Sequence, residues 1–299
     1  MSKPVIRTYK DSNDLKRMQK LTQAIWSLEP NYHIGDLAWQ RYRHAGREND
    51  WDTAIWEMDG NTVAWGWIQK PGELICQVDP DFPEVAKDVI DWFDKITKTN
   101  EQKVTVLETE SHLISALEDS LFNPLAENPE VLTKISLDSC SFPVQLPDKF
   151  KGRHIKGSED LTNRVAVHKA AFHKSRVTEE SYLNVMNTYP YDSSLDWVIE
   201  SPNGEFVASC LIWFDEVNKV GLLEPVGTDA RFRRMGLASS VCKLALNALS
   251  ERGAKTAVVV CTSPDACELY KSIGFEKFAQ TKSFHRLKNT YYTSLLFFN

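Results

Sequence analysis

A short basic segment offers the clearest chemistry in this 299-residue sequence. The apolar stretch Leu222–Val226 leads into a loop that contains Arg233 and Arg234. Gly236 follows, and a helical pattern begins at Leu237. The first turn of a helix presents unpaired N–H groups and a positive dipole end. The arginines add fixed positive charge and the glycine lets a ligand approach the backbone, so the segment suits a phosphate or pyrophosphate group.

Flanking elements must hold this segment in place. Apolar residues recur at helical spacing between Leu237 and Leu249, which predicts a helix with one buried face. A second apolar strand is predicted at Thr256–Cys261, and the block Tyr270–Phe275 follows it. The order is therefore strand, basic loop, helix, strand. The alternative interpretation is an ordinary strand–loop–helix connection whose arginines are only solvated.

Two motifs in this region resemble those of a known family. The spacing Arg-x-x-Gly-x-Ala at residues 233–238 resembles the acetyl-CoA-binding motif of the GNAT (GCN5-related N-acetyltransferase) superfamily. Tyr270–Phe275 resembles the Leu-Tyr-x-x-x-Gly-Phe block that follows in the same family, and the two blocks occur in the right order. The resemblance covers residues 153–287 well and the first half by element order alone. It is closest to tandem GNAT proteins with a degenerate N-terminal copy.

The resemblance implies an α/β (α+β) fold of two tandem acyl-CoA N-acyltransferase-like domains, each a twisted mixed sheet flanked by helices. The family's fourth and fifth strands, here Gly221–Thr228 and Thr256–Cys261, splay apart and receive the pantetheine arm. One acetyl-CoA per chain is expected, with no metal. The implied cofactor-binding residues are Val226, Gly227, Thr228, Arg233, Arg234, Met235, Gly236, Leu237, Ala238, Ser239 and Ser263.

Amine acetylation requires a proton acceptor for the ammonium group and a proton donor for the departing thiolate. Tyr270 stands where the family often has this general acid, although a Tyr that packs with its hydroxyl satisfied by backbone is the alternative. Glu224 could accept the amine proton, directly or through a water, or could be a solvent-facing strand residue. The backbone N–H of Val226 is the expected oxyanion donor.

One position departs from the family pattern. Many members have Asn three residues before the Ala of the final helix, and the place counted back from Ala266 holds Ser263. A serine still forms hydrogen bonds but has a shorter reach. Because Pro264 follows it, Ser263 could serve only as the N-cap of that helix.

The acceptor is less well defined than the donor. The predicted function is transfer of an acetyl group to a primary amine of a small molecule or peptide, by direct attack in a ternary complex. Family resemblance places part of the pocket on the helices of residues 161–191 and at the end of the third strand. A non-catalytic acetyl-CoA-binding sensor or scaffold is the alternative, and an O-acyl or longer-acyl transferase is a third possibility. The candidate pocket residues are His168, His173, Tyr182, Tyr189, Tyr191, Trp213, Phe214 and Asp215.

The order of predicted elements repeats with a period of about half the chain. The strand and helix start at residues 6–15 match those at 153–161, and the hairpin at Asp59–Asn61 matches one at Asn203–Gly204. We predict a degenerate GNAT-like domain at 1–140, a linker at 141–152 and the acetyltransferase domain at 153–299. The apolar run at 291–298 is expected to form a strand or to pack against the other copy, with an oligomer contact as the alternative.

The first copy lacks the basic motif. Residues 79–84 occupy its place and contain acidic residues together with Pro80 and Pro83. Carboxylates would repel a pyrophosphate, and prolines lack the N–H donors that it needs. The first copy is therefore predicted not to bind CoA in this manner.

Composition narrows the class of protein. Hydrophobic residues make up 42% and charged residues 25%, values typical of a globular protein. A net charge of −6 argues against a general nucleic-acid binder. The six cysteines form no C-x-x-C pair, and no metal-ligand spacing is present. With no signal peptide or membrane-spanning run, we expect a cytoplasmic monomer or homodimer with no membrane or nucleic-acid partner.

Overall fold

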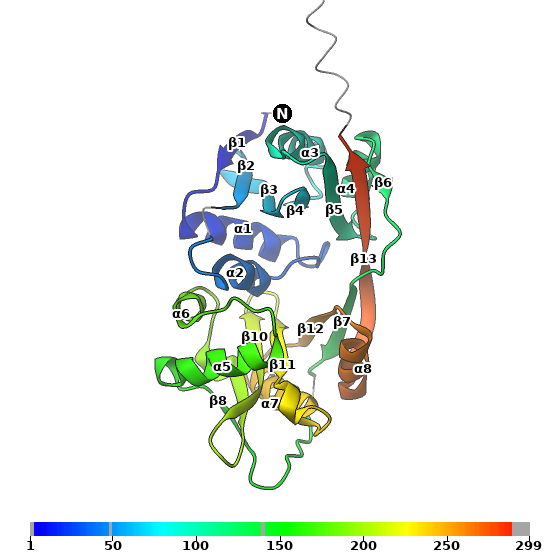
Figure 1. Ribbon diagram of the computed structural model, residues 1–299. Coiled ribbons are helices and arrows are strands. Elements are labelled where there is room, and N and C mark those ends of the chain that lie inside the picture. The colour runs from blue at the N-terminus through cyan, green and yellow to red at the C-terminus, as the bar shows by residue number, and fades with distance from the viewer. Residues whose placement is uncertain (1–2, 48–49, 139–140, 289–299) are drawn as a thin grey trace, which may run out of the picture. The chain divides into compact units, whose positions relative to one another are not determined.

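The computed structural model describes residues 3–47, 50–138 and 141–288 (Figure 1). The chain forms two compact units, and neither is continuous in sequence. Unit 1 gathers residues 1–31, 49–129 and 279–299, whereas unit 2 gathers 32–48 and 130–278. The expected strand at 291–298 lies outside the described residues.

Unit 1 is a mixed sheet with helices, in the strand order β1-β2-β3-β4-β5-β13, and the short β6 pairs with β13. Its elements are β1 (Val5–Thr8), α1 (Ser12–Ala24), β2 (Asp52–Met58), β3 (Asn61–Lys70), β4 (Glu73–Val78), α3 (Val85–Ile96), β5 (Glu101–Leu107), α4 (Ser111–Asp119), β6 (Asn123–Pro124) and most of β13 (Glu276–Leu287).

Unit 2 repeats this design, with the strand order β7-β12-β11-β10-β9-β8. Its elements are α2 (Ile34–Tyr42), β7 (Val131–Ser136), β8 (Lys151–His154), α5 (Leu161–Ala171), α6 (Glu179–Met186), β9 (Asp196–Glu200), β10 (Phe206–Asp215), β11 (Val220–Thr228), α7 (Leu237–Glu251), β12 (Thr256–Cys261) and α8 (Pro264–Ile273). The predicted fold class, two mixed α/β units, is confirmed.

The two units exchange segments of the chain. β7, from the end of the first half, pairs antiparallel with β12 of unit 2 along its whole length. β13, at the end of the second half, pairs antiparallel with β5 of unit 1. Helix α2 also comes from the first half and belongs to unit 2. The predicted domain boundaries, at residues 140 and 153, divide the chain according to the repeat along the sequence. They stay a prediction.

A matching ion pair supports the repeat. Arg7 donates two hydrogen bonds of 2.8 Å to Asp14, seven residues later. Arg153 donates bonds of 2.6 and 2.9 Å to Asp160, again seven residues later. Each pair joins the first strand of a copy to the start of its first helix region, and bidentate Arg–carboxylate pairs fix both position and orientation.

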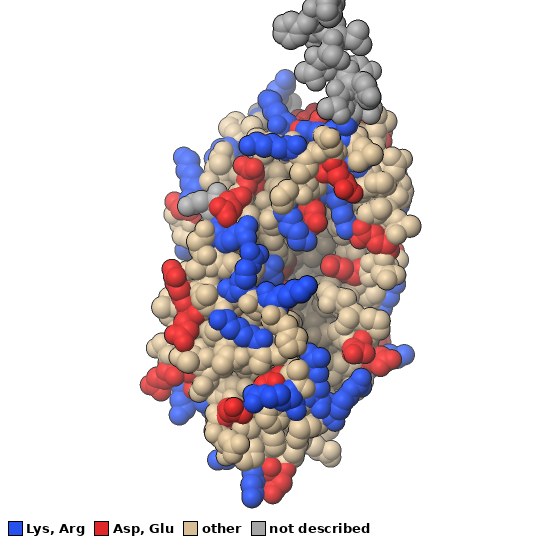
Figure 2. Space-filling view, in the orientation of Figure 1, with Lys and Arg blue, Asp and Glu red and all other residues tan. Residues whose placement is uncertain are grey.

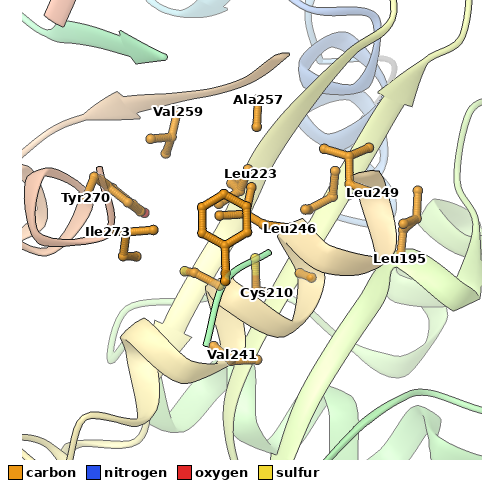
Figure 3. Close-up of a cluster of buried hydrophobic side chains, with 14 of the residues drawn as sticks. Leu195, Cys210, Leu223, Val241, Leu246, Leu249, Ala257, Val259, Tyr270 and Ile273 are labelled. Carbon is orange, nitrogen blue, oxygen red and sulfur yellow. The ribbon is translucent and has the colours of Figure 1, made fainter. Parts of the chain in front are cut away.

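The core of unit 2 supports the basic loop. Side chains of α7, including Val241, Leu246 and Leu249, pack with sheet residues such as Cys210 and Leu223 (Figure 3). Burial of each large aliphatic side chain contributes roughly 1.5–3 kcal/mol. The helical periodicity that was visible in the sequence therefore fixes α7 on the sheet and, with it, the position of the loop that precedes it.

Unit 1 buries two carboxyl groups near the ends of β4 and β5. Glu110 accepts hydrogen bonds from the Leu107 backbone N–H at 2.6 Å and from the Asn31 side chain at 3.0 Å. Glu29 lies 3.2 Å from the His112 ring. Burial raises the pKa of Glu110 to about 8 and the pKa of Glu29 to about 7, because each charged form has lost its water.

These carboxyl groups predict a stability that falls as pH rises. The folded state holds a proton on Glu110 that the unfolded chain releases near pH 4.5. The stabilising contribution of Glu110 is therefore fully present below that pH. It is lost as the pH rises to about 8, at about 1.4 kcal/mol per pH unit. We expect Glu110→Gln, which mimics the protonated form, to remove most of this slope in hydrogen exchange of β4 and β5 peptides. Glu108→Gln is the exposed control, and equal slopes in the two variants would contradict the prediction.

Candidate active site

β11 and β12 diverge part-way along their length. Their parallel ladder joins Val220, Gly221 and Leu222 to the first residues of β12. Beyond Leu222, β11 continues to Thr228 with β10 as its neighbour, and β12 continues to Cys261 beside β7. The divergence leaves one backbone edge of residues 223–228 without a partner strand among the described residues.

The register of β11 shows which backbone groups face that gap. The Asp229 N–H donates to the Val207 carbonyl at 2.9 Å, which fixes the phase of the antiparallel ladder. Because bonded and non-bonded positions alternate, Gly227 takes the next bonded position. Val226 and Thr228 therefore turn their N–H and C=O groups away from β10, toward β12. In addition, the Thr228 hydroxyl is buried and has no hydrogen-bond partner.

The loop after β11 ends in an open helix N-terminus. Arg234 and Gly236 adopt left-handed backbone conformations, with φ of 63° and 76°. Gly236 is the N-cap of α7, and no side chain caps this helix. Residues 233–236 are exposed, whereas Leu237 is buried and anchors the helix. The first N–H groups of α7 therefore face solvent beside two exposed arginines.

Arg231 has a different role from Arg233 and Arg234. Its guanidinium pairs with Asp229 at 2.8 Å, and the Asp229 carboxylate also accepts the Arg231 backbone N–H at 2.9 Å. This pair shapes the loop between β11 and α7. Figure 2 shows basic and acidic side chains scattered among other residues over one face of the molecule.

A cavity of about 320 Å³ opens where β11 and β12 diverge. All of its walls belong to unit 2, including the α2 segment. It contains two predicted catalytic residues and residues that the sequence did not indicate. The lining residues are Trp39, Arg43, His44, His168, Phe172, Ser175, Val177, Leu223, Glu224, Pro225, Val226, Val259, Val260, Thr262 and Tyr270.

Helix α2 forms one wall because it packs tightly on β10. A Cβ placed on Gly35 would lie 2.0 Å from the Cβ of Trp213, so only glycine allows this approach. The His33 side chain caps α2 by accepting the Gly35 N–H at 3.0 Å, and its other nitrogen lies 3.4 Å from the Val220 carbonyl. The buried Trp213 indole donates to the Glu224 carbonyl at 2.7 Å. The same tryptophan therefore fixes both α2 and the strand that holds Glu224.

Glu224 is half-buried at the cavity wall. Its carboxyl group is hydrogen-bonded to that of Asp36 on α2, and Asp36 also accepts a bond from Gln40. Burial, followed by the nearby Asp36 charge, raises the pKa of Glu224. A carboxyl group whose pKa is moved toward neutral pH suits proton transfer to or from a substrate.

Tyr270 projects from α8 into the buried cluster (Figure 3) and is 6% exposed. Its ring packs edge-on against Phe275 at 5.7 Å between centroids. Burial raises the pKa of the Tyr270 phenol well above its usual value, so the hydroxyl stays protonated over the working pH range. The residue therefore both packs in the core and lines the cavity.

Other predicted residues occupy different places. Ser263 caps α8 by accepting the Ala266 N–H at 3.3 Å, which agrees with its capping interpretation. Ala238 and Ser239 are half-buried in the first turn of α7, and Met235 is 41% exposed in the loop. Gly227 packs against the end of α5, where a Cβ would lie 2.7 Å from that of Ala171.

Of the predicted acceptor-pocket residues, only His168 lines this cavity. Tyr182 and Tyr191 donate hydrogen bonds to the buried Asp196, which also pairs with Arg164. Trp213 lies beneath α2. Four others lie elsewhere: Tyr189 and Phe214 line a separate open cavity, Asp215 is buried at the end of β10, and His173 is exposed.

No sequence pattern pointed to Trp39, Arg43 and His44 as pocket residues. Trp39 lies on α2 and the other two directly follow it, in a segment that the sequence repeat assigns to the first domain. Burial and nearby arginines lower the pKa of His44 to about 4, so its ring is neutral. Within the described ranges, no group of three or more His, Cys, Asp or Glu could hold a metal ion. No described helix combines the length and apolar character needed to cross a bilayer.

Comparisons with known proteins cover both halves of the chain. Residues 200–284 match the model of the family described as FR47-like protein. A GCN5-related N-acetyltransferase from Sphaerobacter thermophilus has a TM-score of 0.63 at 15% identity over 95% of each chain. A tandem GNAT protein from the clavulanic acid biosynthesis pathway gives 0.65 at 10% identity, over 95% of this chain and 98% of that one. A GNAT-family acetyltransferase from Colwellia psychrerythraea gives 0.61 at 13% identity, over 94% and 99%. No curated protein sequence matches the chain significantly.

The packing of α2 predicts an unusual effect of Gly35→Ala. Alanine normally stabilises a helix by roughly 1 kcal/mol relative to glycine. Here the new methyl group would meet the Trp213 Cβ and Cγ, and we expect a loss of about 3 kcal/mol in urea unfolding. Gly152→Ala is the control, because its methyl group would meet only the flexible tip of Leu244. A Gly35→Ala protein as stable as the wild type would disprove this packing.

Proposed function

The chain has the fold of the GNAT superfamily, and on that premise we propose that it is an acetyl-CoA-dependent N-acetyltransferase. The acceptor is a primary amine of a small molecule or peptide, which attacks directly in a ternary complex. One observation carries this proposal. The divergence of β11 and β12 joins an open, basic helix N-terminus to a cavity with a carboxyl group at its wall.

The residues present fit one CoA molecule. Backbone groups of Val226 and Thr228, together with the unpartnered Thr228 hydroxyl, can pair with the amides of a pantetheine arm. The first N–H groups of α7, with Arg233 and Arg234, can bind its pyrophosphate. When bound, acetyl-CoA supplies an activated acetyl thioester. Ser263 stays a weaker candidate, because its hydroxyl already caps α8.

The chain's own side chains provide the proton transfers. Glu224 accepts a proton from the ammonium group of the acceptor, which frees the nitrogen lone pair. The Val226 N–H, turned toward the gap, is positioned to stabilise negative charge on the carbonyl oxygen. Tyr270, protonated because of its burial, donates a proton to the departing thiolate.

Unit 1 is proposed not to bind CoA. Its β4 and β5 diverge like their counterparts, with a parallel ladder only at Glu73 and Leu74. The loop that follows, residues 79–84, contains two prolines and leads to α3, whose N-cap residue is Glu84. These features disfavour a pyrophosphate, so one CoA per chain is expected.

Acetyl-CoA binding depends on the arginines in this proposal. We expect Arg233→Glu with Arg234→Glu to weaken binding at least tenfold in isothermal titration, because charge reversal repels the pyrophosphate. Lys255→Glu is the matched control: it reverses an exposed charge at the start of β12, the end away from the gap. Equal affinity in all three proteins would overturn the assignment of the phosphate site.

Turnover separates an enzyme from a non-catalytic CoA-binding module. With a panel of amines and thiol detection, we expect Glu224→Gln to lower kcat by roughly 10²–10⁴-fold while acetyl-CoA binding is retained. Tyr270→Phe should lower kcat and leave affinity within about twofold, since only a hydroxyl is removed. Binding of acetyl-CoA without turnover of any amine by the wild type would favour the sensor or scaffold alternative.

A further inference from the structure

We propose that Asp36, on helix α2 in the first half of the sequence, forms with Glu224 a two-carboxyl proton acceptor for the acetyl-transfer reaction. This inference rests on the proposed function and assigns a positioning residue to the same site. Asp36 acts through Glu224, which is the group that lines the cavity. The acceptor therefore depends on a segment that sequence alone assigns to the other domain.

The hydrogen bonds give each carboxyl group a defined role. The Gln40 side chain donates to Asp36 Oδ1 at 2.6 Å, one helical turn along α2. The carboxyl groups of Asp36 and Glu224 are hydrogen-bonded to each other, an interaction that lowers the pKa of Asp36 and raises that of Glu224. Trp213 contacts both α2 and the Glu224 backbone, and it thereby holds the segments that contain Asp36 and Glu224 next to each other.

Two half-buried carboxyl groups in contact share protons, because a second negative charge so close to the first is strongly unfavourable. Burial and mutual repulsion raise the pKa of both groups above the usual carboxyl range. The pair therefore keeps one proton and one negative charge through the neutral range, and its two ionisations belong to the pair. The single negative charge of the pair can attract an ammonium group, and a second ionised carboxylate in the same place is not needed.

Other charged or titratable groups around the pair have smaller effects. Arg43, just after α2, lowers the pKa of Glu224, and Glu130, just before β7, raises it. Tyr270 on α8 stays protonated. On α5, the His168 ring is neutral because burial lowers its pKa to about 3. After burial itself, the neighbouring Asp36 charge is the main cause of the raised Glu224 pKa, which makes Asp36 the residue to test.

The proton balance of the step is simple. The N–H bond of the ammonium breaks, and its proton passes to Glu224 when that group is ionised. The nitrogen lone pair then forms the new N–C bond, the C–S bond breaks, and sulfur leaves with the electron pair and takes a proton from Tyr270. By repelling a second charge, Asp36 makes Glu224 the stronger base and sets the pH at which it becomes available.

Direct titration tests the pair without any turnover. The full-length protein is labelled with ¹³C at the glutamate carboxyl carbon, and the Glu224 signal is assigned by its loss in Glu224→Gln. We expect Asp36→Asn, which keeps the shape and can still accept from Gln40, to lower the pH midpoint of Glu224 by about one unit or more. Glu216→Gln, an exposed carboxyl change in the same unit, should leave the midpoint unchanged. The same midpoint in wild type and Asp36→Asn would overturn the inference.

The pH dependence of kcat/KM provides the second arm. Activity that needs ionised Glu224 should rise with pH, and this limb should move to lower pH in Asp36→Asn by the same amount as the titration. A shifted titration with an unshifted rate profile would overturn the catalytic role, although the carboxyl pair would exist. Absence of turnover by the wild type would instead reject the proposed function, and the titration would still decide whether Asp36 and Glu224 are coupled.

Discussion

The parting of β11 from β12 after Leu222 is the constraint on which unit 2 depends. A sheet normally satisfies every backbone group by pairing, and a gap between two central strands leaves amide groups that need a partner. Here the alternation of the β10–β11 ladder turns Val226 and Thr228 toward that gap. Helix α7 follows β11 after the loop of residues 229–236, so the free edge of the strand leads through that loop to the free N–H groups of the helix.

Packing around the gap then determines what can enter it. Helix α2 closes one side only because Gly35 allows it to rest on Trp213, and that tryptophan also holds the Glu224 carbonyl. The contacts that fix the wall are thus the contacts that place the carboxyl group. Without the Asp36 carboxyl group, Glu224 would be a lone acid with a different proton affinity.

Local patterns were predictable from the sequence because they depend on near neighbours. The periodicity of α7, the strand at 256–261 and the Asp59–Gly60 turn all match the structure. The exchange of β7, β13 and α2 was not predictable, because pairing with β12 or β5 offers the same alternation and similar apolar partners. The contact between Asp36 and Glu224 follows from that exchange, so no spacing rule could reveal it. Similarly, the sequence around Ser263 fits both a ligand contact and a helix N-cap. The hydrogen bond from the Ala266 N–H to the Ser263 hydroxyl shows that Ser263 is an N-cap.

The two units share a backbone plan and differ in the charges beside the gap. In both, a parallel ladder is short and an arginine–aspartate pair ties the first strand to the first helix region. Helix α8, which follows β12 in unit 2, has Ser263 as its N-cap residue. Helix α4, which follows β5 in unit 1, has Glu110 in that position. Burial keeps the Glu110 carboxyl group protonated up to about pH 8, so the charges that disfavour an anion in unit 1 are those of the acidic loop at residues 79–84. A repeat can therefore lose an anion site with its scaffold intact, since the strands depend on apolar burial and the site depends on a few charges.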